Sequence, residues 1–455
     1  MNRRTRATAL VLLPIAIACK ESYSISEPPT ELTIDTELRQ TIGGWGAVPL
    51  LPVAKQNPAL VDLGRSLFFD KILSGNRDVA CATCHDPAAS AGDALALPIG
   101  TGGSGIGVAR TLGHGRQFVP RNAPSLLNQG LGHFYLFWDG RVNEEGGPGR
   151  FRTPTNVPIP GGVTSLLAAQ AMLPVLNRDE MRGQAGDRDV AGNPNELAAL
   201  SDATPSEIWN AAMRRLLAIQ EYQAKFNAAY PGVPTTAFGF QHAASAIAAF
   251  EIEAFTRQKS AFDRFLAGDN RAMTVDEKRG ALLFFGEARC SSCHSGALLG
   301  GQQFANIGIP QIGPGVGKAA PLDLGRGEEF PQVQQYQFAF RVQPLRNVEL
   351  TAPYMHNGAY ATLEAVVRHY NNADSSHRNY DPSTLPAAVQ SSYHGDALTK
   401  QRVLQSLDFR LREPLRLTDA KQKQLVAFLK SLTDPTARNL ASITPASVPS
   451  GLSVR

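Results

Sequence analysis

The chain has 455 residues, and its 44 Lys and Arg exceed its 40 Asp and Glu by a formal net charge of +4. Residues 1–18 carry three arginines and no acid, so the rest of the chain has 44 − 3 = 41 basic residues against 40 acidic ones. This near-neutral balance, without a basic tract, excludes nucleic acid as an expected partner. The length is sufficient for two or three domains with a large core.

Residues 1–18 are predicted to be a signal peptide, because a basic end precedes a short apolar run and a small-residue exit. The run is short for a membrane span. Cys19 leaves two alternatives open, which are plain cleavage and a lipid-modified cysteine that anchors the protein to a membrane. Both predict export, with a periplasmic location. The polar residues 19–55 are expected to be a tether.

The body begins with a stretch in which apolar residues recur at helical spacing. Similar patterns predict helices at 58–73, 164–172, 205–230 and 241–266. A Gly-rich segment at 97–121 contains a formal G-x-G-x-x-G match. It lacks the strand and helix that a nucleotide site needs on either side, so we expect a flexible loop.

Cys-x-x-Cys-His, the attachment motif for c-type haem, occurs twice. The first copy runs from Cys81 through Cys84 to His85, and the second from Cys290 through Cys293 to His294. The two thiolates of each motif bond to haem, and the histidine ligates the iron. A disulfide, a redox pair or half a zinc site would leave the histidine unexplained in both copies. The sequence therefore predicts two covalently bound haem c groups.

An internal repeat accompanies the two motifs. Gly64–Phe69 matches Gly280–Phe285, and each segment is followed by its Cys-x-x-Cys-His. A capping box at Thr274–Glu277 opens the second of these helices. The repeat predicts a mostly α-helical protein with two cytochrome-c-like haem domains and long loops. We expect the domains at 56–268 and 269–436, followed by a flexible Ser/Pro-rich tail at 437–455.

These motifs, in this order and spacing, resemble the bacterial di-haem cytochrome c peroxidase family, including its MauG-like branch. The matching segments are 67–85, 112–141, 169–181, 255–294 and 345–370. The resemblance implies an oxidoreductase that reduces hydrogen peroxide at the N-terminal haem, with electrons passed through the C-terminal haem.

The resemblance also implies roles for residues around the first haem. Glu180 matches the distal glutamate that moves protons during peroxide cleavage. Trp138 matches the tryptophan that lies between the haems and relays electrons. His114 matches a displaceable ligand of the first iron, but its interval from His85 is longer than in typical members. The sequence therefore leaves open whether His114 binds the iron or the site stays open.

The second iron shows an informative departure from conventional members, which have a methionine at the position of Tyr370. The MauG-like branch has tyrosine there, and an anionic phenolate stabilises oxidised iron. Met355, His356 and His369 are rival ligands. The resemblance further implies one calcium ion between the domains, a hard cation that oxygen ligands suit. Its ligands would be Asn122, Thr351 and Pro353.

Three functions follow as alternatives. The first is peroxide reduction with electrons from a small cytochrome c or cupredoxin. The second is MauG-like, peroxide-dependent oxidation of a partner protein. The third is a di-haem electron carrier without catalysis, against which Glu180 argues. The sequence leaves the electron donor and the oligomeric state open, a homodimer included.

Overall fold

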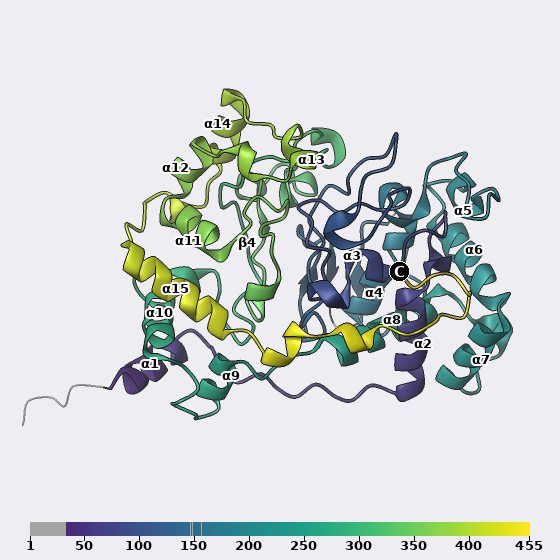
Figure 1. Cartoon of the computed structure of the whole chain (residues 1–455), viewed down its shortest axis with the longest axis horizontal. Helices are drawn as coiled ribbons and strands as arrows, with labels where there is room; N and C mark the ends of the chain where they lie inside the picture. Colours follow the sequence, from purple (N-terminus) through teal and green to yellow (C-terminus); the bar gives the residue numbers. More distant parts are fainter. Residues whose placement is uncertain (1–32, 146, 148, 156) are drawn as a thin grey trace, which may run out of the picture.

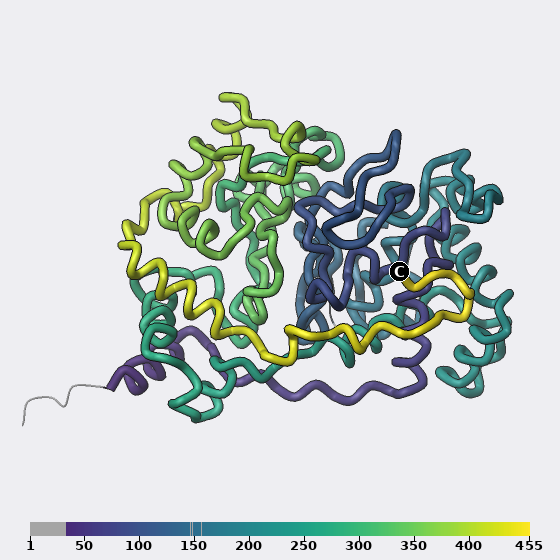
Figure 2. Tube along the Cα trace, in the orientation of Figure 1, coloured from purple at the N-terminus to yellow at the C-terminus, as the bar shows by residue number. Residues whose placement is uncertain are grey.

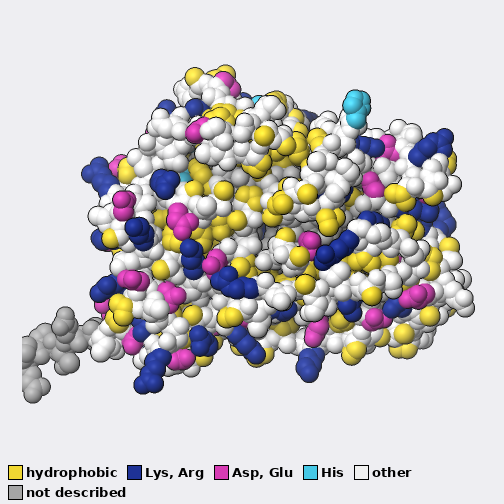
Figure 3. All heavy atoms as spheres, in the orientation of Figure 1, with side chains coloured by type: hydrophobic (Ala, Val, Ile, Leu, Met, Phe, Trp, Pro, Cys, Tyr) yellow, Lys and Arg dark blue, Asp and Glu magenta, His cyan; other side chains and the backbone are white. Residues whose placement is uncertain are grey.

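The computed structural model describes residues 33–145, 147, 149–155 and 157–455. The predicted signal peptide and Cys19 lie outside the described residues. Within them, no helix is both long enough and apolar enough to cross a membrane. Figure 3 shows acidic and basic side chains interspersed over one face of the molecule, as the balanced composition predicts.

The protein is mostly α-helical, as predicted, and its strands are very short (Figure 1). β1 (Tyr135–Leu136), β2 (Val142–Glu144) and β3 (Phe151–Arg152) form an antiparallel sheet in that order. β4 (Phe304–Ala305) and β5 (Phe340–Arg341) form a second, antiparallel pair. Long loops join the helices. The first Cys-x-x-Cys-His motif forms a short α-helix, Cys81–Cys84, and the second begins with a 3₁₀ turn, Cys290–Ser292.

The first half of the chain packs around a large hydrophobic core, and a smaller cluster that includes Leu136 and Leu166 lies beside it. Its main helices are α2 (Pro58–Phe69), α3 (Cys81–Cys84), α4 (Leu166–Ala171), α5 (Glu196–Ala199), α6 (Pro205–Leu217), α7 (Gln220–Ala229) and α8 (Phe240–Phe255). Local chemistry fixes where α2 begins. Asn57 accepts a hydrogen bond from the Ala59 backbone N–H at 2.9 Å, and Pro58 occupies the first turn, where no N–H is needed.

The second half packs around a separate core and a smaller cluster that also includes Ala96 and Leu97 of the first half. Its helices are α9 (Ala261–Leu266), α10 (Val275–Phe285), α11 (Leu363–Asn371), α12 (Ala373–Arg378), α13 (Ala387–Gln390), α14 (Ala397–Gln405) and α15 (Asp419–Ser431). The predicted capping box opens α10, because Thr274 and Glu277 each accept the other's backbone N–H. The division of the chain between residues 268 and 269 stays a prediction.

The repeated segments pack alike in the two halves. α2 crosses α8, and α10 crosses α15. A Cβ added at Gly64 would lie 1.9 Å from the Ala246 carbonyl oxygen, and one added at Gly280 would lie 1.9 Å from that of Gln424. The repeat therefore keeps glycine at the point where two helix backbones touch.

The predicted tether contains a helix, α1 (Ile34–Gly43), that packs against α10. Leu38 and Ile42 are buried there, and Lys278 pairs with Asp35 at 2.6 Å. This segment therefore packs onto the body of the protein, and its role as a tether stays a prediction. Two apolar residues four positions apart form one helical face, and α10 covers that face.

The predicted flexible tail is also packed. It runs back along the first half of the chain (Figure 2), where Leu440 and Val448 join the first core. The Ser450 hydroxyl donates to the buried Asp70 carboxylate at 2.6 Å. Because a buried carboxylate needs donors, this hydrogen bond helps to hold a segment whose Ser/Pro composition predicted fraying.

Candidate active site

The two Cys-x-x-Cys-His motifs each line a cavity. The first cavity is formed by α3 and neighbouring elements, and it brings Cys81, Cys84 and His85 together with Glu180. Each motif makes one tight turn, because the histidine N–H donates to the carbonyl of the first cysteine at 2.9 Å in both copies. In each motif, the turn brings the two thiols and the imidazole to the wall of one cavity.

Both motif histidines are prepared to ligate a metal. His85 Nδ1 donates to the Ala91 carbonyl at 3.3 Å, and His294 Nδ1 donates to the Leu299 carbonyl at 3.0 Å. These bonds orient the rings, and Nε2 is the nitrogen that would ligate the iron. Burial lowers the pKa of both histidines to about 4, so both rings are neutral, as ligation requires.

The motif thiols suit covalent attachment of haem. The four cysteines are free, and no disulfide joins either pair. Burial raises the pKa of Cys81 and Cys290 to about 12, which disfavours their thiolates in the protein without cofactor. The neutral thiols and the thioethers that haem attachment would form are both uncharged, so these buried positions accept either. The donor set therefore fits haem c at both motifs.

Glu180 lies in a π-helical turn, Arg178–Arg182, that faces the first cavity. Asn177 caps this turn by accepting the Asp179 N–H at 3.0 Å. Single π-helical turns occur often at functional sites, where they redirect a side chain. Burial raises the pKa of Glu180, and the field of Arg141 partly opposes that rise. The carboxyl is thereby moved toward the range in which it can both take and give a proton.

The Gly-rich segment supports the turn that carries Glu180. The Thr101 N–H donates to the Glu180 carbonyl at 3.0 Å, and a Cβ at Gly100 would lie 2.1 Å from the Asp179 carbonyl oxygen. Arg110 donates to three carbonyls of the same segment. The expected flexible loop is therefore a braced support, and its glycine is needed for close approach to the turn.

Trp138 links the two halves. Its indole Nε1 donates to the Asn122 carbonyl at 2.8 Å, and its own carbonyl accepts the Arg341 N–H at 2.7 Å. Trp138 lines the second cavity, and its ring centre lies 6.4 Å from that of His356. His356 in turn stacks on Phe340 at 3.6 Å. A chain of aromatic rings thus runs from Trp138 into the second half.

A buried ionic cluster adjoins Trp138. Arg121 donates to Asp323 at 2.6 and 2.8 Å and also pairs with Asp139. Burial alone would raise the pKa of Asp139, but Arg121 and Arg141 outweigh it and hold that pKa well below its usual range. Asp139 is therefore ionised, and the cluster joins the two halves of the chain.

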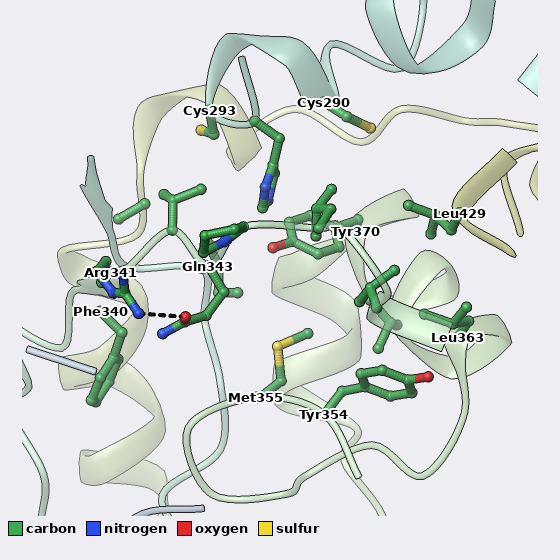
Figure 4. A pocket seen from close by; sticks show the side chains of 18 of the residues that line it. Cys290, Cys293, Phe340, Arg341, Gln343, Tyr354, Met355, Leu363, Tyr370 and Leu429 are labelled. Carbon is green, nitrogen blue, oxygen red and sulfur yellow. Dashed lines mark hydrogen bonds between the residues drawn. The ribbon is translucent and has the colours of Figure 1, made fainter. Parts of the chain in front are cut away.

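The second cavity contains the rival ligands opposite His294. Figure 4 shows the Tyr370 hydroxyl and the Met355 sulfur both directed into it, below Cys290 and Cys293. Burial raises the pKa of Tyr370 above its ordinary value, so a phenolate needs a metal to form here. His369 Nε2 donates to the Ile307 carbonyl at 2.7 Å, and its Nδ1 lies 3.0 Å from Ser376 Oγ. With both nitrogens engaged, His369 is not available as a ligand.

The predicted ligand His114 and the predicted calcium ligands do not form complete sites in the described part of the chain. His114 is exposed in its loop and is not part of the lining of the first cavity, so the structure does not bring it to His85. Thr351 and Pro353 line the second cavity, and the Asn122 N–H donates to the nearby His356 carbonyl at 2.7 Å. The described residues contain no cluster of three or more His, Cys, Asp or Glu that would hold a metal ion. The predicted calcium site at Asn122, Thr351 and Pro353 stays a prediction.

Two polar residues of the first cavity were missed from the sequence, Gln170 on α4 and Glu251 on α8. Glu251 is only 9% exposed, and burial raises its pKa to about 8. One feature of the sequence could have indicated that Glu251 is buried. Glu251 is the first acid in a long run of apolar and small residues, at a position that continues the buried face of α8.

Comparison with known proteins shows the family of the chain. A family model described as di-haem cytochrome c peroxidase matches residues 58–271. Cytochrome c551 peroxidase of Pseudomonas aeruginosa is 32% identical over 324 residues, which are 71% of this chain and 73% of that protein. The chain belongs to the di-haem cytochrome c peroxidase family. It is accordingly a peroxidase-type oxidoreductase, and its family implies two haem c groups and hydrogen peroxide as substrate.

The family includes MauG proteins. Methylamine utilization protein MauG of Methylorubrum extorquens is 28% identical over 398 residues, which are 86% of this chain and 84% of that protein. A solved MauG-like protein associated with microbial copper homeostasis matches with a TM-score of 0.57 and 26% identity, covering 87% of this chain and 95% of that one. The chain is thus similar to both branches of the family, as its sequence predicted.

Proposed function

We propose that the protein reduces hydrogen peroxide to water at the His85 site, with electrons delivered through the His294 site. The observation that carries this proposal is the position of Glu180, which lines the same cavity as Cys81, Cys84 and His85. An electron carrier has no need of such a group. Bound haem would supply the electrons that break the O–O bond.

Glu180 would handle the protons of the reaction. Its carboxylate takes a proton from one peroxide oxygen and delivers it to the other, which leaves as water. Two electrons and two protons convert each peroxide into two waters. The raised pKa of Glu180 supports this double role, because a carboxyl of ordinary acidity holds a proton poorly near neutral pH.

Trp138 would carry electrons between the two sites. Its hydrogen bond to Asn122 and its contact with His356 support this role. A calcium ion held by Asn122, Thr351 and Pro353 would stabilise the same junction. Calcium content of the purified protein, determined by metal analysis, tests that assignment.

The second site favours a MauG-like variant of this activity as the alternative. Tyr370 faces the cavity, and a phenolate would stabilise the oxidised iron held by His294. Such a site accepts electrons poorly from a cytochrome c or cupredoxin of ordinary potential. A partner protein whose aromatic side chains are oxidised would then replace the small electron donor. The periplasm, with or without a lipid anchor at Cys19, suits either partner.

The decisive experiment is peroxide turnover by the Glu180→Gln variant. We expect activity to fall about 10²- to 10⁴-fold, the usual contribution of a general acid–base group. Asp179→Asn is the matched control, because Asp179 lies in the same π-helical turn and instead accepts a hydrogen bond from Gln184. Full activity in Glu180→Gln would overturn the proposal. Two haems per chain in both variants, measured as pyridine haemochromes, would show that the cofactors are intact.

A further inference from the structure

Arg341 in β5 is a buried cation that forms no ion pair with any residue that the structure describes. It is 3% exposed, and it donates from Nη1 to the Tyr135 carbonyl at 2.7 Å and from Nη2 to Gln343 Oε1 at 2.8 Å. Among the described residues, its Nε has no hydrogen-bond partner. Burial lowers the pKa of Arg341 to about 10, against the weaker influence of Asp139. A buried charge is costly unless an opposite charge pairs with it.

The two neighbouring carboxylates already form ion pairs with other arginines. Asp139 pairs with Arg121 and Arg141, and Asp323 pairs with Arg121. With Arg341, the cluster therefore holds three guanidinium groups and two carboxylates. One positive charge remains without a counter-charge from the described part of the chain.

Gln343 adds a second unsatisfied donor next to Arg341. Its Oε1 is occupied by Arg341, whereas its buried Nε2 has no hydrogen-bond partner in the described residues. Both side chains line the second cavity, together with Cys290, Cys293 and His294. Figure 4 shows Arg341 and Gln343 side by side at one end of this cavity and the apolar Leu363 and Leu429 at the other.

We propose that Arg341 and Gln343 form a carboxylate site that holds a propionate of the haem attached at Cys290 and Cys293. Two adjacent N–H donors, one of them charged, match a carboxylate. The site is buried in the cavity of the second haem motif, so its occupant must enter with the cofactor. Haem is itself apolar apart from its propionates, which agrees with a cavity that is polar at one end and apolar at the other.

The site has a consequence for electron transfer. A guanidinium beside the second haem favours the reduced iron, so Arg341 would oppose the effect of the Tyr370 phenolate. The backbone N–H of Arg341 also donates to the Trp138 carbonyl. Arg341 would thus contact a propionate of the second haem through its side chain and hold Trp138 through its backbone.

The test is a potentiometric titration of the holoprotein. In Arg341→Gln we expect the ratio of reduced to oxidised second haem at a fixed potential to fall about tenfold, which equals about 59 mV for a one-electron couple. The propionate bending band in resonance Raman spectra should shift as well. Arg412→Gln removes an exposed arginine of the same half and is the matched control, for which we expect neither change.

An unchanged potential together with an unchanged Raman band in Arg341→Gln would overturn the inference. If that variant does not accumulate, Gln343→Met decides the question, because it removes the amide donor and keeps the charge. An unshifted propionate band in Gln343→Met would equally reject the site. Neither readout needs turnover, so failure of the proposed peroxidase activity would be recognised separately.

Discussion

Glu251 provides a direct test of how the first cavity is built. The carboxyl is buried on α8, and burial raises its pKa from 4.5 to about 8. In the unfolded chain the same group ionises near its ordinary value. Between pH 4.5 and about 8, the carboxyl of Glu251 is therefore protonated in the folded protein and ionised in the unfolded chain. The free energy of unfolding falls as the pH rises through this window. Below the window Glu251 is protonated in both states and its ionisation does not change that free energy.

The magnitude follows from the size of this window. Each pKa unit corresponds to about 1.36 kcal/mol, so burial of Glu251 should cost about 4 kcal/mol more at pH 8 than at pH 5. Glu251→Gln removes the ionisation and keeps the shape. We expect the variant and the wild type to have similar unfolding free energies at about pH 5 and the variant to be more stable at about pH 8, by about 4 kcal/mol.

Urea unfolding of the holoprotein at the two pH values, followed by far-ultraviolet circular dichroism, measures this difference. Glu253→Gln is the matched control, because Glu253 is exposed on the same helix and should show no such gain. A stability difference between Glu251→Gln and wild type that is the same at both pH values would refute the reasoning. It would mean that Glu251 is ionised in the folded protein.

Three further predictions concern the second iron, the repeat and the first iron. Tyr370→Met should raise the reduction potential of the second haem in a potentiometric titration, and a potential that fails to rise would count against phenolate ligation. Gly280→Ala should lower the unfolding free energy by about 1–3 kcal/mol, because its Cβ would meet the Gln424 carbonyl oxygen at 1.9 Å, whereas Gly43→Ala in α1, with open space around it, should not destabilise. Since His114 is exposed, His114→Ala should leave the high-spin signal of the oxidised first haem unchanged in electron paramagnetic resonance, and a gain of that signal would identify His114 as a ligand.

Much of the candidate site could be read from local patterns. Cys-x-x-Cys-His is a contiguous motif whose spacing already fits one turn of chain, so both haem attachment points were evident. The capping box at Thr274 and the helical stripe before Phe69 are equally local. Glu180, Trp138 and Tyr370 were available only through the resemblance to a family, because a lone glutamate, tryptophan or tyrosine has no pattern of its own.

The sequence by itself determined the two haem motifs, the helical class and the repeat, because each depends on residues within a few turns of one another. Only the tertiary structure decided which distant segments meet. It placed α1 on α10, returned the tail to Asp70, and set Glu251 in the first cavity. It also set Arg341 beside the second cavity with an Nε that has no hydrogen-bond partner in the described part of the chain. Burial and unpaired charge are properties of assembled surroundings, and no local pattern encodes them.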